Sequence, residues 1–155
     1  MRWLILFLAT GLYSGYVPRA PGTAGSVVGL VLVWGVSAPL ERHSHAAAAV
    51  LIVLLFGGGC WLAGRAEEIL HQRDSPHIVI DEVVGMAVTM LLNPTGLAAL
   101  GAGFALFRLF DILKPEPAGI IDRRLQGGVA VMLDDAVAAI YANLVLRGLS
   151  LIGAF

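Results

Sequence analysis

The stretch Ala46–Gly64 carries no charged residue, and it constrains the fold more than any other part of the sequence. A helix needs about 20 residues to cross the roughly 30 Å hydrocarbon core of a bilayer, and this stretch meets that requirement. The final stretch, Val129–Phe155, is also long enough. The whole chain of 155 residues is 58% hydrophobic and 14% charged, with a mean hydropathy of +0.85. Soluble domains average about 45–50% hydrophobic residues and about 25% charged residues. We therefore expect a small integral membrane protein with one domain over residues 1–155.

Shorter apolar stretches fill much of the remaining chain. They are Trp3–Val17, Ser26–Leu40, Val83–Leu92 and Thr95–Phe110. Their apolar residues run too continuously for the period-two pattern of strands, so we expect an all-α, compact multi-helix bundle. These four stretches are short for a full crossing and are expected to be half-buried, tilted or re-entrant. The first is expected to be a retained helix, since it lacks the small-x-small cleavage site of a signal peptide.

Proline and glycine clusters separate these stretches and predict turns. They lie at Pro18–Gly22, Pro39, Asn93–Pro94 and Pro115–Gly119. Composition excludes other classes of protein. With 10 basic and 11 acidic residues the chain has no basic stripe for nucleic acid, and its one cysteine, Cys60, cannot form an internal disulfide.

Charged residues are distributed unevenly between the connecting loops. If all six stretches cross the membrane, one side carries Arg19, Arg65, Arg73, Arg108, Lys114, Arg123 and Arg124, and the other side carries Arg2, Arg42 and Arg147. The positive-inside rule places the first set in the cytoplasm. Every acidic residue except Glu41 falls on that same side. The functional loops are therefore expected on one cytoplasmic face.

The segment Gly15–Ser26 combines two prolines and several glycines with the start of an apolar helix. Thr23 or Ser26 is expected to cap that helix. Free amides at a helix start, with a hydroxyl nearby, can bind an anion. The alternative is an ordinary capped turn between two helices.

Two pairs of adjacent carboxylates interrupt apolar runs. Asp81-Glu82 precedes one apolar helix and Asp134-Asp135 precedes another. Ionised carboxylates at membrane depth are unfavourable and usually mark a functional site. A divalent cation would compensate their charge, and hard oxygen ligands suit Mg²⁺. The alternative for Asp81 and Glu82 is a helix start whose dipole stabilises acids.

Arg108, Asp111 and Lys114 are spaced three apart, so they can share one helical face. Such a face places two cations around one carboxylate. The alternative is a surface ladder of ion pairs, which contributes little to stability.

The four polar blocks, in this order, resemble the phosphatidylglycerophosphatase A family of lipid phosphatases. The strings that carry the resemblance are Pro-x-x-Pro-Gly-Thr-x-Gly-Ser at 18–26, Asp-Glu-x-x-Gly at 81–85, Phe-Arg-x-Phe-Asp-x-x-Lys-Pro-x-Pro at 107–117, and Asp-Arg-x-x-x-Gly-Gly-x-x-x-Met-x-Asp-Asp at 122–135. The resemblance covers roughly residues 11–145. It implies Mg²⁺-dependent removal of the terminal phosphate of phosphatidylglycerophosphate, giving phosphatidylglycerol, at the cytoplasmic face of the bacterial inner membrane.

The resulting hypothesis gives each candidate residue a role. The catalytic and metal-binding set is Asp81, Glu82, Asp111, Asp134 and Asp135. The substrate-binding set is Pro21, Gly22, Thr23, Gly25, Ser26, Arg108, Lys114, Asp122 and Arg123. One or two Mg²⁺ ions would polarise the phosphate and activate water. The expected partners are the lipid substrate and the bilayer.

Two alternatives remain, one another kind of enzyme and one from a different protein class. A transferase that uses Asp-rich helices would show Asp-x-x-Asp, which this chain lacks. A small ion carrier would use the acidic residues as a cation path, with charges near the midplane serving both sides of the membrane. The one-sided acids of this chain favour an enzyme.

Overall fold

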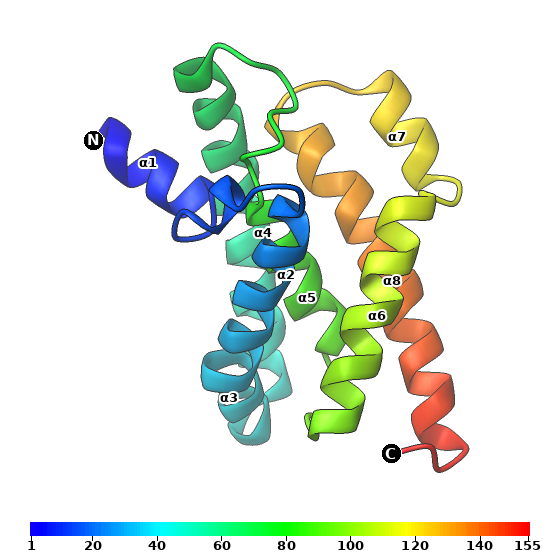
Figure 1. Ribbon diagram of the computed structural model, residues 1–155. Helices are drawn as coiled ribbons and strands as arrows, with labels where there is room; N and C mark the ends of the chain where they lie inside the picture. Colours follow the sequence, from blue (N-terminus) through cyan, green and yellow to red (C-terminus); the bar gives the residue numbers. More distant parts are fainter.

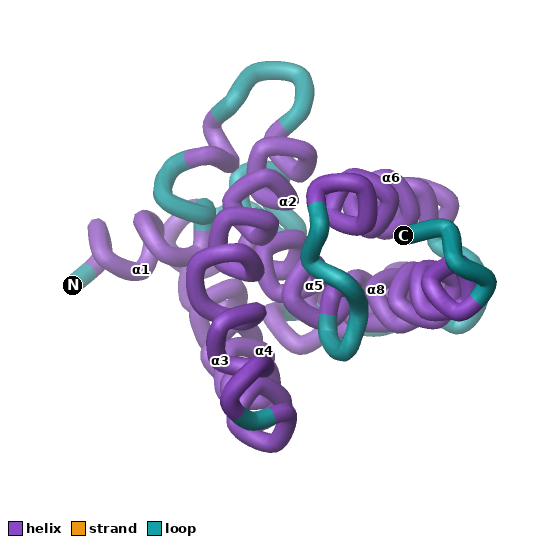
Figure 2. The backbone as a smooth tube through the Cα atoms, turned by 90° about the horizontal axis from the view of Figure 1, so that it is seen from below, coloured by secondary structure: helices purple, strands orange, loops and turns teal.

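The computed structural model describes residues 1–155 and is helical throughout, with no strand (Figures 1 and 2). The elements in chain order are α1 (Arg2–Ala9), η1 (Ser14–Tyr16), α2 (Pro21–Leu32), η2 (Val33–Ser37), α3 (Ala38–His43), α4 (His45–Leu70), α5 (Ile80–Met90), α6 (Leu97–Leu113), α7 (Ala118–Arg124) and α8 (Gly128–Leu151). The expected all-α architecture is confirmed.

Three helical segments are long and apolar enough to cross a membrane: Pro21–His43, His45–Leu70 and Gly128–Leu151. The first combines α2, η2 and α3, and is longer than the predicted stretch Ser26–Leu40. The prediction that Pro39 marks a turn is wrong. Pro39 lies inside the continuous helix, directly after the π-helical turn η2, which shifts the hydrogen-bond register where proline lacks a donor.

The expectation that the first apolar stretch is too short for a full crossing is confirmed. Helix α1 has 8 residues, about 12 Å of helix, so it cannot span the bilayer. Left-handed residues Gly11, Leu12 and Tyr13 then turn the chain back. Arg2 would lie opposite the acids if all six stretches crossed, but it lines a shallow hollow with Arg65 and Glu68 at the end of α4. The basic residues are therefore more one-sided than the sequence predicted.

Helix α5 is short and buried, and it forms the centre of the bundle. Its 11 residues span about 16 Å, roughly half of a bilayer core. It packs against α2 on one side and α8 on the other. The side-chain amide of Asn143 on α8 donates to the carbonyl oxygens of Val88, Thr89 and Leu91. These bonds satisfy carbonyls that a helix end would otherwise leave unpaired.

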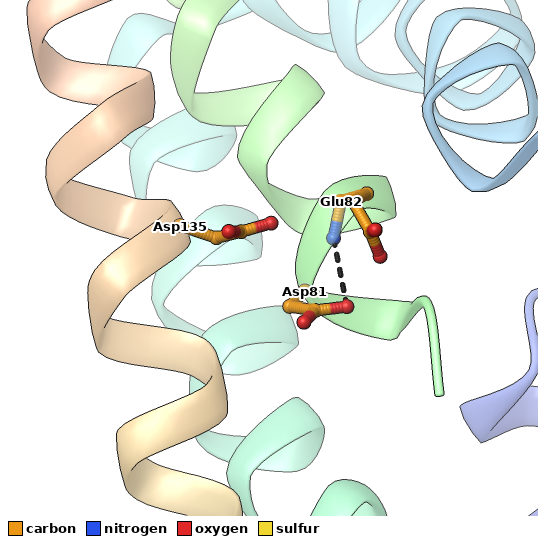
Figure 3. Close-up of side chains that lie close together, drawn as sticks. All are labelled: Asp81, Glu82 and Asp135. Atoms are coloured by element: carbon orange, nitrogen blue, oxygen red, sulfur yellow. Dashed lines mark hydrogen bonds between the residues drawn. The ribbon is translucent and has the colours of Figure 1, made fainter. Parts of the chain in front are cut away.

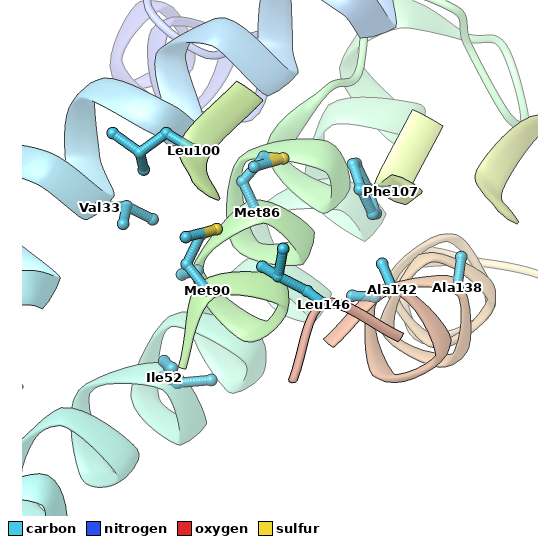
Figure 4. Close-up of a cluster of buried hydrophobic side chains, with 11 residues drawn as sticks. Val33, Ile52, Met86, Met90, Leu100, Phe107, Ala138, Ala142 and Leu146 are labelled. Carbon is cyan, nitrogen blue, oxygen red and sulfur yellow. The ribbon is translucent and has the colours of Figure 1, made fainter. Parts of the chain in front are cut away.

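The hydrophobic core surrounds α5 (Figure 4). Its buried side chains come from five elements and are Val33, Ile52, Met86, Ala87, Met90, Leu100, Phe107, Ala138, Ala139, Ala142 and Leu146. The alanines on α8 permit a close approach of α8 to α5. Gly29 does the same for α2, since a Cβ there would lie 2.7 Å from Met86 Cβ. This close packing fixes the depth of the N-terminus of α5 relative to its neighbours.

Candidate active site

The starts of α2, α5 and α8 and the end of α6 meet around one cavity of about 430 Å³. Eighteen residues line it: Arg19, Ala20, Pro21, Gly22, Thr23, Asp74, Ser75, Pro76, Ile78, Asp81, Glu82, Arg108, Asp111, Ile112, Lys114, Val131, Asp134 and Asp135. All four sequence blocks contribute charged residues to this wall. Because helix N-termini carry partial positive charge, the convergence of the N-termini of α2 and α5 on the cavity favours an anionic ligand.

Three carboxylates form the deepest polar cluster of the cavity. One oxygen from each of Asp81, Glu82 and Asp135 lies within 4.8 Å of the others. Figure 3 shows Asp135 extending from α8 toward the pair on α5. Asp81 Oδ1 accepts a hydrogen bond from the Glu82 amide at 3.0 Å. Although adjacent helical positions differ by about 100°, both members of the pair face the cavity.

The charge of this cluster is poorly compensated by the protein. Glu82 Oε2, Asp134 Oδ1 and Asp135 Oδ2 are buried and have no hydrogen-bond partner. Burial, reinforced by the charges of Glu82 and Asp135, holds the pKa of Asp81 well above its usual range. Burial also raises the pKa of Glu82, against the opposing effect of Arg108. A carboxylate cluster with raised pKa values and free oxygens is a suitable environment for a cation.

Arg108 joins the carboxylates of α5 to those of α6. Its Nη1 atom lies 2.5 Å from Asp111 Oδ2 and 3.7 Å from Glu82 Oε1. Arg108 and Asp111 are one helical turn apart, so this part of the predicted helical face is confirmed. The Nε atom of Arg108 is buried with no partner. The guanidinium therefore retains a donor for a bound anion.

Lys114 reaches the site differently from the prediction. It does not continue the helical face, because α6 ends at Leu113 and Lys114 is its left-handed C-cap, with φ 43°. Its Nζ donates to Asp122 Oδ1 at 2.5 Å and to Asp134 Oδ2 at 2.6 Å. Burial lowers the pKa of Lys114, but the two carboxylates outweigh that effect and raise it. Lys114 thus stays charged beside the cavity.

The beginning of α2 supplies the neutral part of the wall. Pro21 occupies the first helical turn, where its missing N–H leaves no bond unmade. The expected side-chain cap is wrong: Ala20 is the N-cap, and Ser26 Oγ instead donates to the Gly22 carbonyl at 2.9 Å. Pro21, Gly22 and Thr23 line the cavity. Gly25 and Ser26 do not, and Gly25 instead permits contact with Val79, 2.7 Å from its missing Cβ.

Comparison with known proteins assigns the chain to a family. A family model described as phosphatidylglycerophosphatase A matches residues 7–150. The chain belongs to the phosphatidylglycerophosphatase A family. No solved structure shows a significant match.

Named relatives cover most of the chain. A phosphatidylglycerophosphatase A of Haemophilus influenzae is 38% identical over 143 residues, 92% of this chain and 86% of the relative. One of Escherichia coli K12 is 33% identical over 134 residues, 86% of this chain and 76% of the relative. A Bacteroides thetaiotaomicron relative, provisionally named a phosphatidylinositol-3-phosphatase, is 33% identical over 148 residues, 93% of this chain and 92% of that relative.

The family assignment makes this chain a phosphatase and gives no support to the ion-carrier alternative. The resemblance noted from the four blocks is confirmed. Within the phosphatidylglycerophosphatase A family fold, all five predicted catalytic residues, Asp81, Glu82, Asp111, Asp134 and Asp135, line one cavity. The structure therefore brings together side chains from three separate blocks of the sequence.

Asp122 and Arg123 lie beside that cavity rather than in it. Both line an adjoining hollow of about 200 Å³ that shares Asp134 with the main cavity. Asp122 bonds to Lys114, and Arg123 forms an ion pair with Glu116. Asp122 therefore acts on the main cavity indirectly, by holding the Lys114 side chain in position.

Sequence reasoning missed three polar residues that line the main cavity: Arg19, Asp74 and Ser75. Arg19 lies inside the Pro-x-x-Pro-Gly block, which could have drawn attention to it. Asp74 and Ser75 lie in the loop between α4 and α5, where no spacing pattern distinguishes them from other loop residues.

Proposed function

We propose that this phosphatidylglycerophosphatase A family member hydrolyses the terminal phosphate monoester of phosphatidylglycerophosphate to phosphatidylglycerol and phosphate, with Mg²⁺ as cofactor. The observation that carries the proposal is the cluster of Asp81, Glu82 and Asp135 oxygens within 4.8 Å. It lies beside the Arg108 guanidinium in a cavity to which the N-termini of α2 and α5 contribute. The relatives from Haemophilus influenzae and Escherichia coli bear the name of this activity.

The donor set fits Mg²⁺. This ion prefers oxygen ligands, needs few carboxylates and keeps several waters. The unpartnered oxygens of Glu82 and Asp135 are available for it. Asp81, Glu82 and Asp135 would hold the ion, with Asp111 and Asp134 next to it. When bound, Mg²⁺ would act as a Lewis acid on the phosphoryl oxygens and offset their charge.

Cationic side chains orient the phosphate in this proposal. Arg108 presents a planar set of donors, suited to two oxygens of one phosphate. Asp111 fixes the guanidinium from the adjacent turn. Lys114 adds a second positive charge, which Asp122 and Asp134 hold in place. Since these positions are set by packing before substrate binds, little reorganisation is required during the reaction.

The attacking water needs a proton acceptor. Asp134 is suited to this role, because its Oδ2 accepts from Lys114 while its Oδ1 has no partner. In the reaction, the oxygen of water bonds to phosphorus and the bond from phosphorus to the glycerol oxygen breaks. The proton released by water is balanced by the one that the departing glycerol oxygen takes up. Phosphate and phosphatidylglycerol are the products.

The placement of the site fits a lipid substrate. The cavity lies at one end of the three potential membrane-spanning helices, and the acyl chains of a lipid could remain in the bilayer beside them. Most basic residues gather at the same end, with Arg42 and Arg147 near the other, which by the positive-inside rule supports a cytoplasmic orientation in the bacterial inner membrane.

The test is product identification with purified full-length protein in detergent micelles. Phosphatidylglycerophosphate, phosphatidate and phosphatidylinositol 3-phosphate are supplied separately with Mg²⁺, and lipid products are identified by mass spectrometry. We expect conversion of phosphatidylglycerophosphate to phosphatidylglycerol with equimolar phosphate. The proposed function would be contradicted if phosphatidate or phosphatidylinositol 3-phosphate were hydrolysed in preference, or if none of the three lipids were hydrolysed.

A further inference from the structure

One of the cationic side chains that line the cavity has no charged or hydrogen-bonding partner in the protein. Six carboxylates and three cationic side chains line it. Arg108 is paired with Asp111 and Glu82, and Lys114 is paired with Asp122 and Asp134. Arg19, the third cation, is exposed and forms no ion pair or side-chain hydrogen bond.

The backbone presents Arg19 in a fixed and unusual way. It has a φ of 68°, in the left-handed region that residues with a Cβ rarely adopt. Pro18 precedes it, and Pro21 begins α2 two residues later. Proline rings restrict both their own φ and the residue before them, so this short turn has few alternative conformations. Left-handed non-glycine residues are concentrated at binding sites, where the surroundings hold them in place.

Arg19 and the acidic cluster occupy different depths. Asp135 is 4% exposed and Asp134 is 7% exposed, so the cluster forms the closed part of the cavity. Arg19 lies at the exposed rim, at the entrance to α2. A ligand that spans the cavity therefore meets carboxylates and Arg108 at one end and a free guanidinium at the other.

The proposed substrate has two phosphates of different kinds. Its terminal phosphate is a monoester, and a phosphodiester joins the headgroup to the diacylglycerol. A guanidinium can bind two oxygens of a phosphate at once. A lipid monoester such as phosphatidate lacks the second phosphate, so it has no group for the guanidinium at the rim to bind.

We propose that Arg19 binds the phosphodiester of the lipid substrate at the cavity rim and so selects headgroups that carry a second phosphate beyond the one removed. This inference rests on the proposed function. Arg19 is thus a specificity-determining residue for substrate binding and takes no part in bond cleavage.

The experiment compares steady-state kinetics of wild type, Arg19→Gln and Arg19→Lys on phosphatidylglycerophosphate in mixed micelles with Mg²⁺. Inorganic phosphate serves as a competing probe of the monoester end. Arg124→Gln is the matched control, since Arg124 is exposed, unpaired and outside both cavities described above. Thermal unfolding of each variant in the same detergent checks folding.

For Arg19→Gln we expect KM to rise about tenfold, the effect of losing one charge-assisted hydrogen-bonded contact. The kcat should change less than about twofold, and the inhibition constant of inorganic phosphate should stay the same. Arg19→Lys should recover part of the KM, and Arg124→Gln should match wild type.

Several results would overturn the inference while leaving the proposed function intact. They are an unchanged KM in Arg19→Gln, a fall in kcat alone, an equal rise in KM in Arg124→Gln, or a parallel loss of phosphate inhibition. Loss of phosphate inhibition would show that Arg19 binds the terminal monoester phosphate instead of the phosphodiester. Absence of phosphate release by wild-type protein would instead overturn the proposed function, and this inference with it.

Discussion

Gly22 lies so close to Glu82 that a Cβ on the glycine would be 2.2 Å from Glu82 Oε1. The same Cβ would be 3.0 Å from Arg108 Nη1. Gly22 therefore lets α2 approach the carboxylate cluster of α5 and the guanidinium of α6 at the same point. The glycine of the Pro-x-x-Pro-Gly block is required by the geometry of the active site as much as by the turn.

Gly22→Ala should lower kcat by tenfold or more, an order-of-magnitude expectation for a displacement of about 1 Å at a reacting centre. Stability should change little, because the atoms displaced are the ends of flexible side chains. The control is Gly58→Ala on α4, whose Cβ would meet nothing within 4 Å. That variant should keep full activity. Equal activity in both variants would show that the contact between Gly22 and Glu82 does not matter for turnover.

Asp135→Asn should abolish turnover without loss of folded protein. The change removes a charge from the cluster but keeps the size of the side chain. Mg²⁺ should raise the thermal unfolding temperature of wild type, because ligands that bind only the folded state stabilise it, and this rise should be absent in the variant. Glu68→Gln, a substitution at an exposed position of α4, is the control. Near-normal activity of Asp135→Asn would remove Asp135 from the ligand set.

Lys114→Ala should weaken binding of both substrate and inorganic phosphate. It removes a positive charge from the cavity and leaves Asp134, which is 7% exposed, without its partner. We also expect a loss of stability on the order of 1 kcal/mol. Lys114→Arg should restore part of the phosphate affinity. If kcat and KM both stay at wild-type values in Lys114→Ala, the ion pairs of Lys114 are structural only.

Asn143→Leu should destabilise the bundle by about 1–3 kcal/mol, because the Leu91 carbonyl oxygen loses its donor and those of Val88 and Thr89 keep only their other donors, the Leu91 amide and the Asn93 side chain. The site lies at the opposite end of α5, so the folded fraction should keep its kcat. Unfolding in a graded denaturing-detergent titration gives the stability, and Leu144→Ala at a neighbouring exposed position is the control. Equal stability of Asn143→Leu and wild type would mean that other donors satisfy these carbonyls.

Much of the site was predictable because charged residues in an apolar chain are conspicuous. Asp81, Glu82, Asp134 and Asp135 interrupt long apolar runs, and such residues must either compensate one another or bind a ligand. Their convergence on one cavity followed from the prediction that the loops lie on one side. Arg108 and Asp111 were placed correctly by helical spacing alone.

The parts that failed depend on backbone detail that hydropathy does not contain. Hydropathy cannot show that left-handed residues after α1 turn the chain back, and only the assumption that all six stretches cross put Arg2 on the other side. The π-helical turn η2 accommodates Pro39, which a local rule treats as a break. Lys114 follows the spacing of a helix but lies one residue past its end. Arg19 lacks any periodic signal, and only the packed structure places it at the cavity rim.

Phosphate release at the carboxylate cluster is proposed to require Mg²⁺, and removing and restoring the ion tests this requirement. Purified protein is given phosphatidylglycerophosphate in micelles with Mg²⁺, then with excess EDTA, then with Mg²⁺ restored above the chelator, and phosphate is followed over time. We expect release to stop with EDTA and to resume when Mg²⁺ is restored. Release that continues unchanged in EDTA would contradict the proposed role of Asp81, Glu82 and Asp135 as metal ligands.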